Sequence, residues 1–89
     1  MKTFQEALDT KVIVSKDVLS GHSPILIVAH FEDGFWQFSG EEIDLPDEEY
    51  RLVTLEEIIK LDDTVLEVAD LPFNAVASRG DAHSDWMIE

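Results

Sequence analysis

The side chains whose types and spacing come closest to a chemical site lie near the C-terminus, in the run Asp81-Ala-His-Ser-Asp85. Alternate residues of an extended chain project to one side, so Asp81, His83 and Asp85 would present two carboxylates and an imidazole together. Such a set could bind Zn²⁺ or Mn²⁺. A D-x-H-x-D spacing without a fourth ligand has little specificity, however, and a solvated tail is the favoured interpretation. The sequence therefore predicts no metal site and no cofactor.

Catalytic groups of other kinds are weakly indicated. His22 and Ser23 are adjacent, and adjacent side chains of an extended chain point apart, so they do not make a dyad. Glu41 and Glu42 could act as an acid and a base, but 89 residues do not supply the walls of a glycosidase cleft. No cysteine is present, and the four glycines match no nucleophile-elbow, Walker or dinucleotide pattern. We predict a protein that is not an enzyme, with a small metal-dependent enzyme as the least favoured alternative.

Carboxylates dominate the middle of the chain. Fourteen of the twenty acidic residues lie between Glu32 and Asp70 against two cations, which gives this stretch a net charge of −12 out of −14 for the whole. Within it, residues 40–50 form an acidic loop with six carboxylates and no cation. Such a field repels nucleic acid and anionic membranes, and it attracts a basic protein over roughly a Debye length. We expect the partner to contact Glu41, Glu42, Asp44, Asp47, Glu48 and Glu49.

The composition indicates one domain over residues 1–89. Disorder requires low hydrophobicity as well as high charge, and 45% of the residues are hydrophobic. The core of so small a domain is thin, and dimerisation could add stability, so monomer and homodimer both stay open. The N-terminus has no apolar stretch of signal-peptide length, and the longest apolar run, residues 25–29, is far shorter than a membrane span. We expect a cytoplasmic protein.

Two segments in the first third of the chain are predicted strands. Residues 11–15 are a β-branched run, and Ile25-Leu-Ile-Val-Ala-His-Phe31 is apolar on both of its alternating faces. The second pattern is typical of a strand in a sheet that is covered on both sides. For the residues before Lys11, a turn of helix and an edge strand both stay open.

A hairpin is predicted next. Glu32-Asp-Gly34 supplies the turn, with glycine available for a positive φ, and residues 35–39 alternate as the returning strand. A three-residue loop sets Val28 opposite Phe38 and His30 opposite Trp36. One core-facing side then holds Leu26, Val28, His30, Trp36 and Phe38, with His30 stacked on Trp36.

Two short helices are predicted after the acidic loop, preceded by a short strand over residues 51–53. Thr54-Leu-Glu-Glu57 has the spacing of a capping box. Asp62 or Thr64 can begin the second helix, and Leu71-Pro72 ends it.

The rest of the chain is a strand and a tail. Residues 73–79 are a predicted last strand, and Arg79 is expected to pair with a nearby carboxylate. The polar tail, residues 80–89, surrounds Trp86, which either closes over the sheet edge or anchors a partner. The order of elements predicts an α+β fold: a small antiparallel-rich sheet with a central hairpin and two short consecutive helices packed on one side.

The chain resembles a bacterial family grouped with the immunity proteins of polymorphic toxin systems, immunity protein 33. The resemblance spans Val12 to Arg79 and rests on Asp33-Gly-Phe-Trp-Gln-Phe-Ser-Gly-Glu-Glu42, Tyr50, Leu55, Ile58-Ile59, Asp62, Leu66, Asp70-Leu-Pro72 and Arg79. The chain departs from the family at Ile27-Val-Ala-His30, where members carry glycine and aromatic residues. The resemblance implies a small cytoplasmic protein that binds and blocks another protein, and it implies no catalytic residues.

The charge and the resemblance together favour an immunity-type inhibitor of a basic toxin or effector domain. If that toxin is a nuclease, the acidic loop would occupy the groove that receives phosphates. The alternative is a stand-alone housekeeping or regulatory domain whose charge keeps it soluble.

Overall fold

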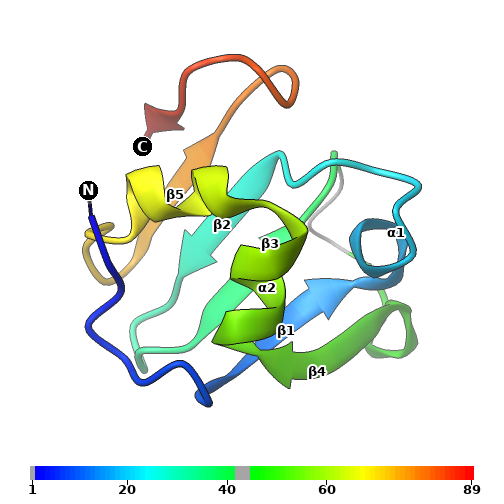
Figure 1. The fold of residues 1–89 in the computed structure, drawn as a ribbon, viewed down its shortest axis with the longest axis horizontal. Coiled ribbons are helices and arrows are strands. Elements are labelled where there is room, and N and C mark those ends of the chain that lie inside the picture. The colour runs from blue at the N-terminus through cyan, green and yellow to red at the C-terminus, as the bar shows by residue number, and fades with distance from the viewer. Residues whose placement is uncertain (1, 42–44) are drawn as a thin grey trace.

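A computed structural model, which describes residues 2–41 and 45–89, shows a six-stranded sheet with short helices packed against it (Figure 1). The predicted α+β class is confirmed. The elements in chain order are β1 (Lys11–Ser15), α1 (Lys16–Leu19), β2 (Ile27–His30), β3 (Trp36–Ser39), the 3₁₀ helix η1 (Asp47–Glu49), β4 (Tyr50–Thr54), α2 (Leu55–Leu61), the 3₁₀ helix η2 (Asp63–Val68), β5 (Ala75–Ser78) and β6 (Met87–Ile88).

The strand order is β4-β1-β3-β2-β5-β6, with β1 and β3 parallel and the other neighbours antiparallel. The hairpin register predicted from the sequence is confirmed, since Val28 lies opposite Phe38 and His30 opposite Trp36. Gly34 has a φ of +92°, as the tight turn requires. The hairpin docks through β3 onto β1, which makes the one parallel contact of the sheet.

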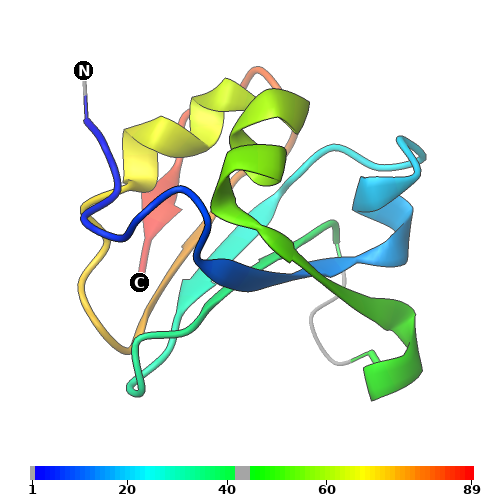
Figure 2. The same ribbon diagram turned by 60° about the horizontal axis from the view of Figure 1, so that its bottom comes forward.

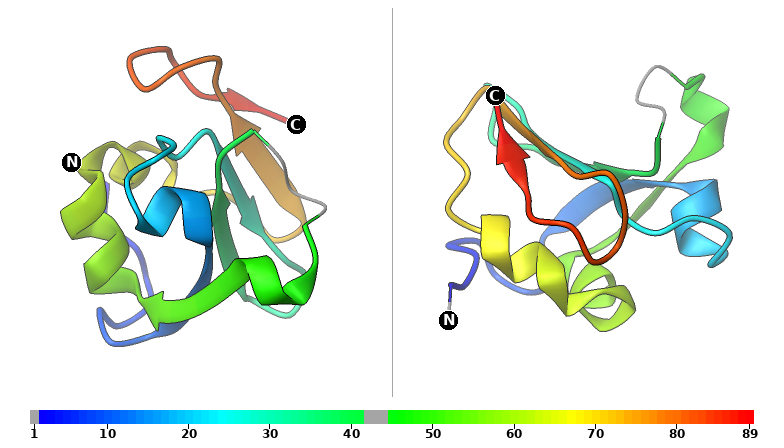
Figure 3. Two further views of the ribbon diagram at one scale, coloured as in Figure 1. Left: turned by 90° about the vertical axis from the view of Figure 1, so that its right-hand side faces the viewer. Right: turned by 90° about the horizontal axis from the view of Figure 1, so that it is seen from above.

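The core lies between one face of the sheet and the two helical segments α2 and η2, which are on the same side (Figure 3, right). Trp36 is 1% exposed, and its ring meets the ring of Phe4 edge-on at 5.0 Å. The other large buried side chains of this layer are Val12, Val14, Val28, Phe38, Leu55, Ile58, Val65 and Val68.

Side-chain caps start both helical segments. In the predicted capping box, Glu57 N–H donates to Thr54 Oγ1 at 3.3 Å, and Thr54 N–H donates to Glu57 Oε2 at 2.9 Å. Of the two candidates for the second start, Asp62 is the cap, and it accepts a hydrogen bond from Thr64 N–H at 3.0 Å. The second segment is a 3₁₀ helix, the tighter form found in short runs.

The expected cover on both sides of the sheet is met only in part: Ala29, Ser15 and Ser39 of the second face are buried. Within the described residues, α2 and η2 pack on one face only, so the second apolar side of β2 is incompletely covered. On that side Ile27 is half-buried and Phe31 is 39% exposed. Leu26 is buried, but it lies outside the main core cluster.

The C-terminal tail forms regular structure, whereas the N-terminal segment does not. The tail is more than a polar loop, because Met87–Ile88 pairs with β5 as the edge strand β6 and Trp86 packs against the core. Residues 2–10 form neither a helix nor a strand, and Phe4 among them is part of the core.

We expect Trp36→Ala to unfold the protein at room temperature. Removing a fully buried large aromatic costs about 3–5 kcal/mol, and a domain of this size has a total stability on the order of 5 kcal/mol. The substitution also removes the Trp36 ring that stacks on His30 at 3.8 Å. Circular dichroism melts check this, with Trp86→Ala as a paired control that should stay folded. A cooperative, unshifted melt of Trp36→Ala would contradict it.

Candidate protein-binding surface

The face of the sheet opposite α2 and η2, called here the open face, is built from alternate residues of every strand. Neighbouring residues in the strand register share a face, and this fixes two parallel rows across the sheet. One row is Leu52, Ile13, Gln37, Ala29 and Val76, and the next is Tyr50, Ser15, Ser39, Ile27, Ser78 and Met87.

Large apolar side chains on the open face remain in contact with solvent. Leu52 is 61% exposed and Met87 is 71% exposed, while Ile13, Ile27 and Val76 are half-buried. These residues come from both edges and the middle of the sheet. They are not continuous, because Gln37 and the buried Ala29 lie between Ile13 and Val76 in the same row.

Carboxylates border the open face on several sides. Because Ser39, Ser15 and Tyr50 share a row, the residues just after β3 and just before β4 meet at one end of the face. Glu89 borders the far edge, since its N–H donates to the Val76 carbonyl at 2.9 Å. This border, called here the acidic rim, comprises Glu32 and Asp33 of the hairpin turn, Glu41, Asp47, Glu48 and Glu49 at the loop end, and Glu89.

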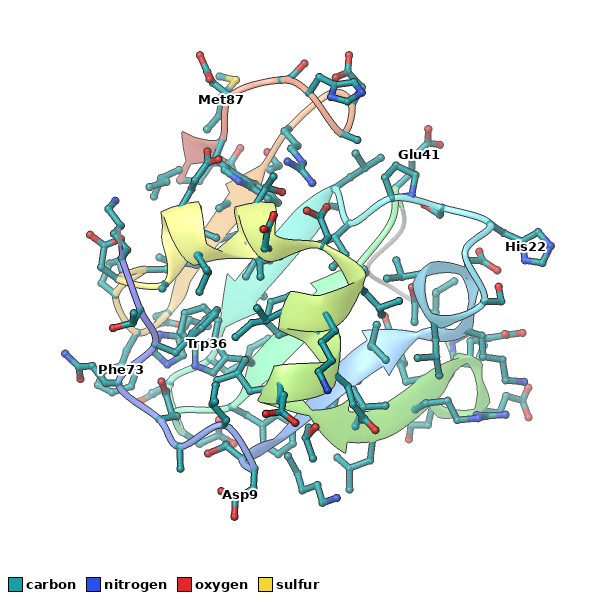
Figure 4. All side chains as sticks on the ribbon, in the orientation of Figure 1. Asp9, His22, Trp36, Glu41, Phe73 and Met87 are labelled. Atoms are coloured by element: carbon teal, nitrogen blue, oxygen red, sulfur yellow. The ribbon has the colours of Figure 1, made fainter. Side chains whose placement is uncertain are left out.

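The sequence-predicted contact residues fall at the loop end of this rim. Glu41, Asp47 and Glu48 are exposed, and Glu41 points outward from the molecule (Figure 4). Glu49 lies 4.0 Å from Lys16 in an exposed ion pair. The remaining two, Glu42 and Asp44, lie outside the described residues. The structure therefore groups four of the six at one end of the sheet.

Local hydrogen bonds occupy backbone groups at both ends of the β4 edge. Tyr50 N–H donates to the Asp47 carbonyl, and the Tyr50 carbonyl accepts from the Arg51 guanidinium at 2.8 Å. Thr54 N–H is taken by Glu57 in the capping box. Since β4 runs from η1 at one end to α2 at the other (Figure 2), both ends of this edge are protected.

The possible catalytic groups are engaged in local contacts. His22 Nδ1 and Ser20 Oγ are 2.6 Å apart, and Ser23 Oγ donates to the Pro24 carbonyl at 3.0 Å, so His22 and Ser23 have separate partners. Both residues line a cleft of about 460 Å³ together with Glu41 and Asp81. In this arrangement Ser23 is not activated by His22.

The tail is not the extended comb that a metal site would need. Asp81 Oδ1 accepts His83 N–H at 2.8 Å in a turn. This backbone hydrogen bond, aided by the Ser84 hydroxyl, lowers the pKa of Asp81 below its ordinary value. Among the described residues, no three His, Asp or Glu side chains are placed to hold a metal ion.

The buried side chain of Arg79 makes several polar contacts in the interior. Its side chain is 2% exposed, and it donates to Asp62 Oδ2 at 2.8 Å and to the Ile25 carbonyl at 3.0 Å. A further hydrogen bond of 2.9 Å reaches Thr64 Oγ1, and the guanidinium lies 4.1 Å from the ring centre of Trp86. The expected pairing of Arg79 with a carboxylate is thus confirmed, and its role is structural.

His30 is part of the core side of the sheet, as predicted. Its ring stacks on Trp36 at 3.8 Å, and Nδ1 donates to the Leu71 carbonyl at 2.7 Å. Nε2 lies 3.8 Å from Glu6 Oε2 and is hydrogen-bonded to no described residue. Because this nitrogen is shut off from solvent, His30 is not a surface ligand.

The three comparisons with known proteins give no match: no family model fits the chain, and no curated protein and no solved structure is similar to it. Among the described residues, no helix has the length and apolar character needed to cross a membrane.

We expect Asp62→Asn to destabilise the protein at pH 7 and to lose this effect in acid. Burial opposes ionisation of Asp62, but hydrogen bonds from Thr64 and from Arg79 outweigh it and lower its pKa. Because the pKa of Asp62 is lower in the folded state, its ionised carboxylate stabilises the protein at a pH above the pKa of the unfolded state. This contribution is lost as the pH falls through the pKa of the folded state.

Urea unfolding from pH 7 to pH 2.5 measures the difference in unfolding free energy between the wild type and Asp62→Asn. The difference should shrink below about pH 4. Asp63→Asn, a change at an exposed neighbour, is the control and should have little effect throughout. A difference for Asp62→Asn that stays constant across this range would contradict the assignment.

Proposed function

We propose that this protein is a small acidic protein-binding module of the cytoplasm, which acts as an immunity-type inhibitor of a basic toxin or effector domain. The proposal rests on the exposed carboxylates Glu41, Asp47 and Glu48 and on the contacts that they make. In the described part of the chain, none of the three forms an ion pair or supports a buried contact. Their charge is therefore available to a partner.

The distribution of charge also supports a binding role over solubility alone. A charge that only keeps a protein soluble works equally well when it is spread over the surface. Here Glu41, Asp47 and Glu48 gather at one end of the open face, where the ends of β3 and β4 meet. Crowding carboxylates in this way raises their mutual repulsion, and a basic partner would relieve it.

The inhibitory action follows from this electrostatics. A basic domain that acts on a polyanion has a positive groove, and the acidic loop would occupy the groove in place of phosphates. The resemblance to immunity protein 33 supports the same action, since such proteins bind and block a toxin. The module itself needs no catalytic group for this role.

We expect neutralising the loop to slow association with the partner. The triple variant Glu41→Gln, Asp47→Asn and Glu48→Gln should lower the association rate by about ten-fold or more at low salt, because exposed charges steer the encounter. The partner to test is the product of the gene immediately upstream, where a toxin gene is expected. Stopped-flow fluorescence measures the rate.

The matched control changes the net charge equally on the helix side of the molecule. Glu56→Gln, Asp63→Asn and Glu67→Gln also remove three exposed carboxylates, and should alter the rate about two-fold or less. Both triple variants should fold like the wild type. If both triple variants slow association equally, or if the wild-type association rate is the same at low and high salt, the charge only keeps the protein soluble and the proposal is contradicted.

A further inference from the structure

The open face poses a mismatch between sequence and fold. The sequence of β2 is apolar on both sides, which is the pattern of a strand covered twice, yet α2 and η2 cover only one side. Val76 of the neighbouring β5 and Ile13 of β1 also place apolar side chains on that side, whereas β3, which lies between β1 and β2, places Gln37 and Ser39 there. A second covering layer would complete the pattern that these strands carry.

We infer that the open face receives the apolar centre of a basic protein surface, while the acidic rim pairs with lysines and arginines around that centre. The inference rests on the proposed function and adds where and how the partner binds. An interface with an apolar centre and a polar border is the usual arrangement in protein complexes. Here Ile13, Ile27 and Val76 would form the centre, between the loop carboxylates at one end and Glu89 at the far edge.

Charge complementarity selects a basic partner over a second copy of this chain. The chain has a net charge of −14. Two open faces stacked on each other would bring two acidic rims together, against few cations: Lys11 opposite Thr54, Lys16 near Glu49 and Arg51 on the Glu48 carbonyl. Like charges placed opposite each other disfavour such an interface. A surface with the opposite border charge meets no such cost.

Lysine substitutions on the open face, in its centre and at its β4 edge, test the inference, because a lysine there would replace an apolar contact with the partner and repel its basic border. The variants are Ile13→Lys with Val76→Lys, and separately Leu52→Lys, whose side chain is 61% exposed and so tolerates the change. The control is Leu61→Lys, which replaces an exposed leucine on α2, on the other side of the molecule.

The probe is a synthetic amphipathic helical peptide with a leucine stripe flanked by lysines. A scrambled peptide of the same composition lacks the stripe, and a third peptide has glutamate in place of lysine. Methyl and amide NMR shifts of the labelled protein report where each peptide binds and how tightly, and circular dichroism confirms that each variant is folded.

We expect the lysine-flanked peptide to shift the methyl signals of Ile13, Ile27 and Val76, and to bind at least about ten-fold more weakly to Leu52→Lys, with Leu61→Lys close to wild type. The open face is not the site if the scrambled peptide binds as tightly as the striped one, or if the striped peptide binds Leu52→Lys and the wild type equally. In either case a basic partner would have to bind elsewhere on the molecule. Equal binding of the glutamate peptide would overturn the basic partner itself. Concentration-dependent dimers that disappear in Leu52→Lys would assign the face to a second copy and also overturn the inference.

Discussion

The ion pair between Arg79 and Asp62 holds the layers of this small domain in place. Arg79 directly follows β5, Asp62 caps η2, and the guanidinium also donates to the carbonyl of Ile25 shortly before β2. Three segments distant in the sequence are therefore fixed by one side chain. Removing one partner of a buried pair costs about 3–5 kcal/mol, because the other is left uncompensated. That is comparable with the total stability of a domain of this size.

This contact also decides which side of the sheet is covered. Because Asp62 both pairs with Arg79 and accepts from Thr64 N–H, η2 must start beside the end of β5. The capping box at Thr54 holds α2 directly after β4, at the opposite edge of the sheet. Both helical segments thus lie on one face of the sheet.

Local signals allowed much of the fold to be predicted. Gly34 and the alternation around it specify the hairpin and its register, and the spacing of Thr54 and Glu57 specifies the start of α2. The strand order was not predictable, because pairing of β1 with β3 depends on contacts that no local pattern encodes. The two-residue strand β6 is too short to give a pattern of its own.

Only the acidic border of the candidate surface could be predicted from the sequence. The number of carboxylates in a segment can be counted without knowing the fold. The apolar part of the open face was not predicted, because an apolar pattern on both sides of β2 predicts two covered faces. In the structure Ile27 is half-buried and Ala29 is buried, both on the face away from α2 and η2.

Methyl cross-saturation in the complex with the upstream gene product tests this account most directly. Saturating the protons of the partner transfers signal loss only to methyl groups in contact with it. The account predicts losses at Ile13, Ile27, Leu52 and Val76, with Leu61 and the core methyls unaffected. Losses confined to the helix side, at Leu61 and Leu66, would contradict the claim that the open face is the binding surface.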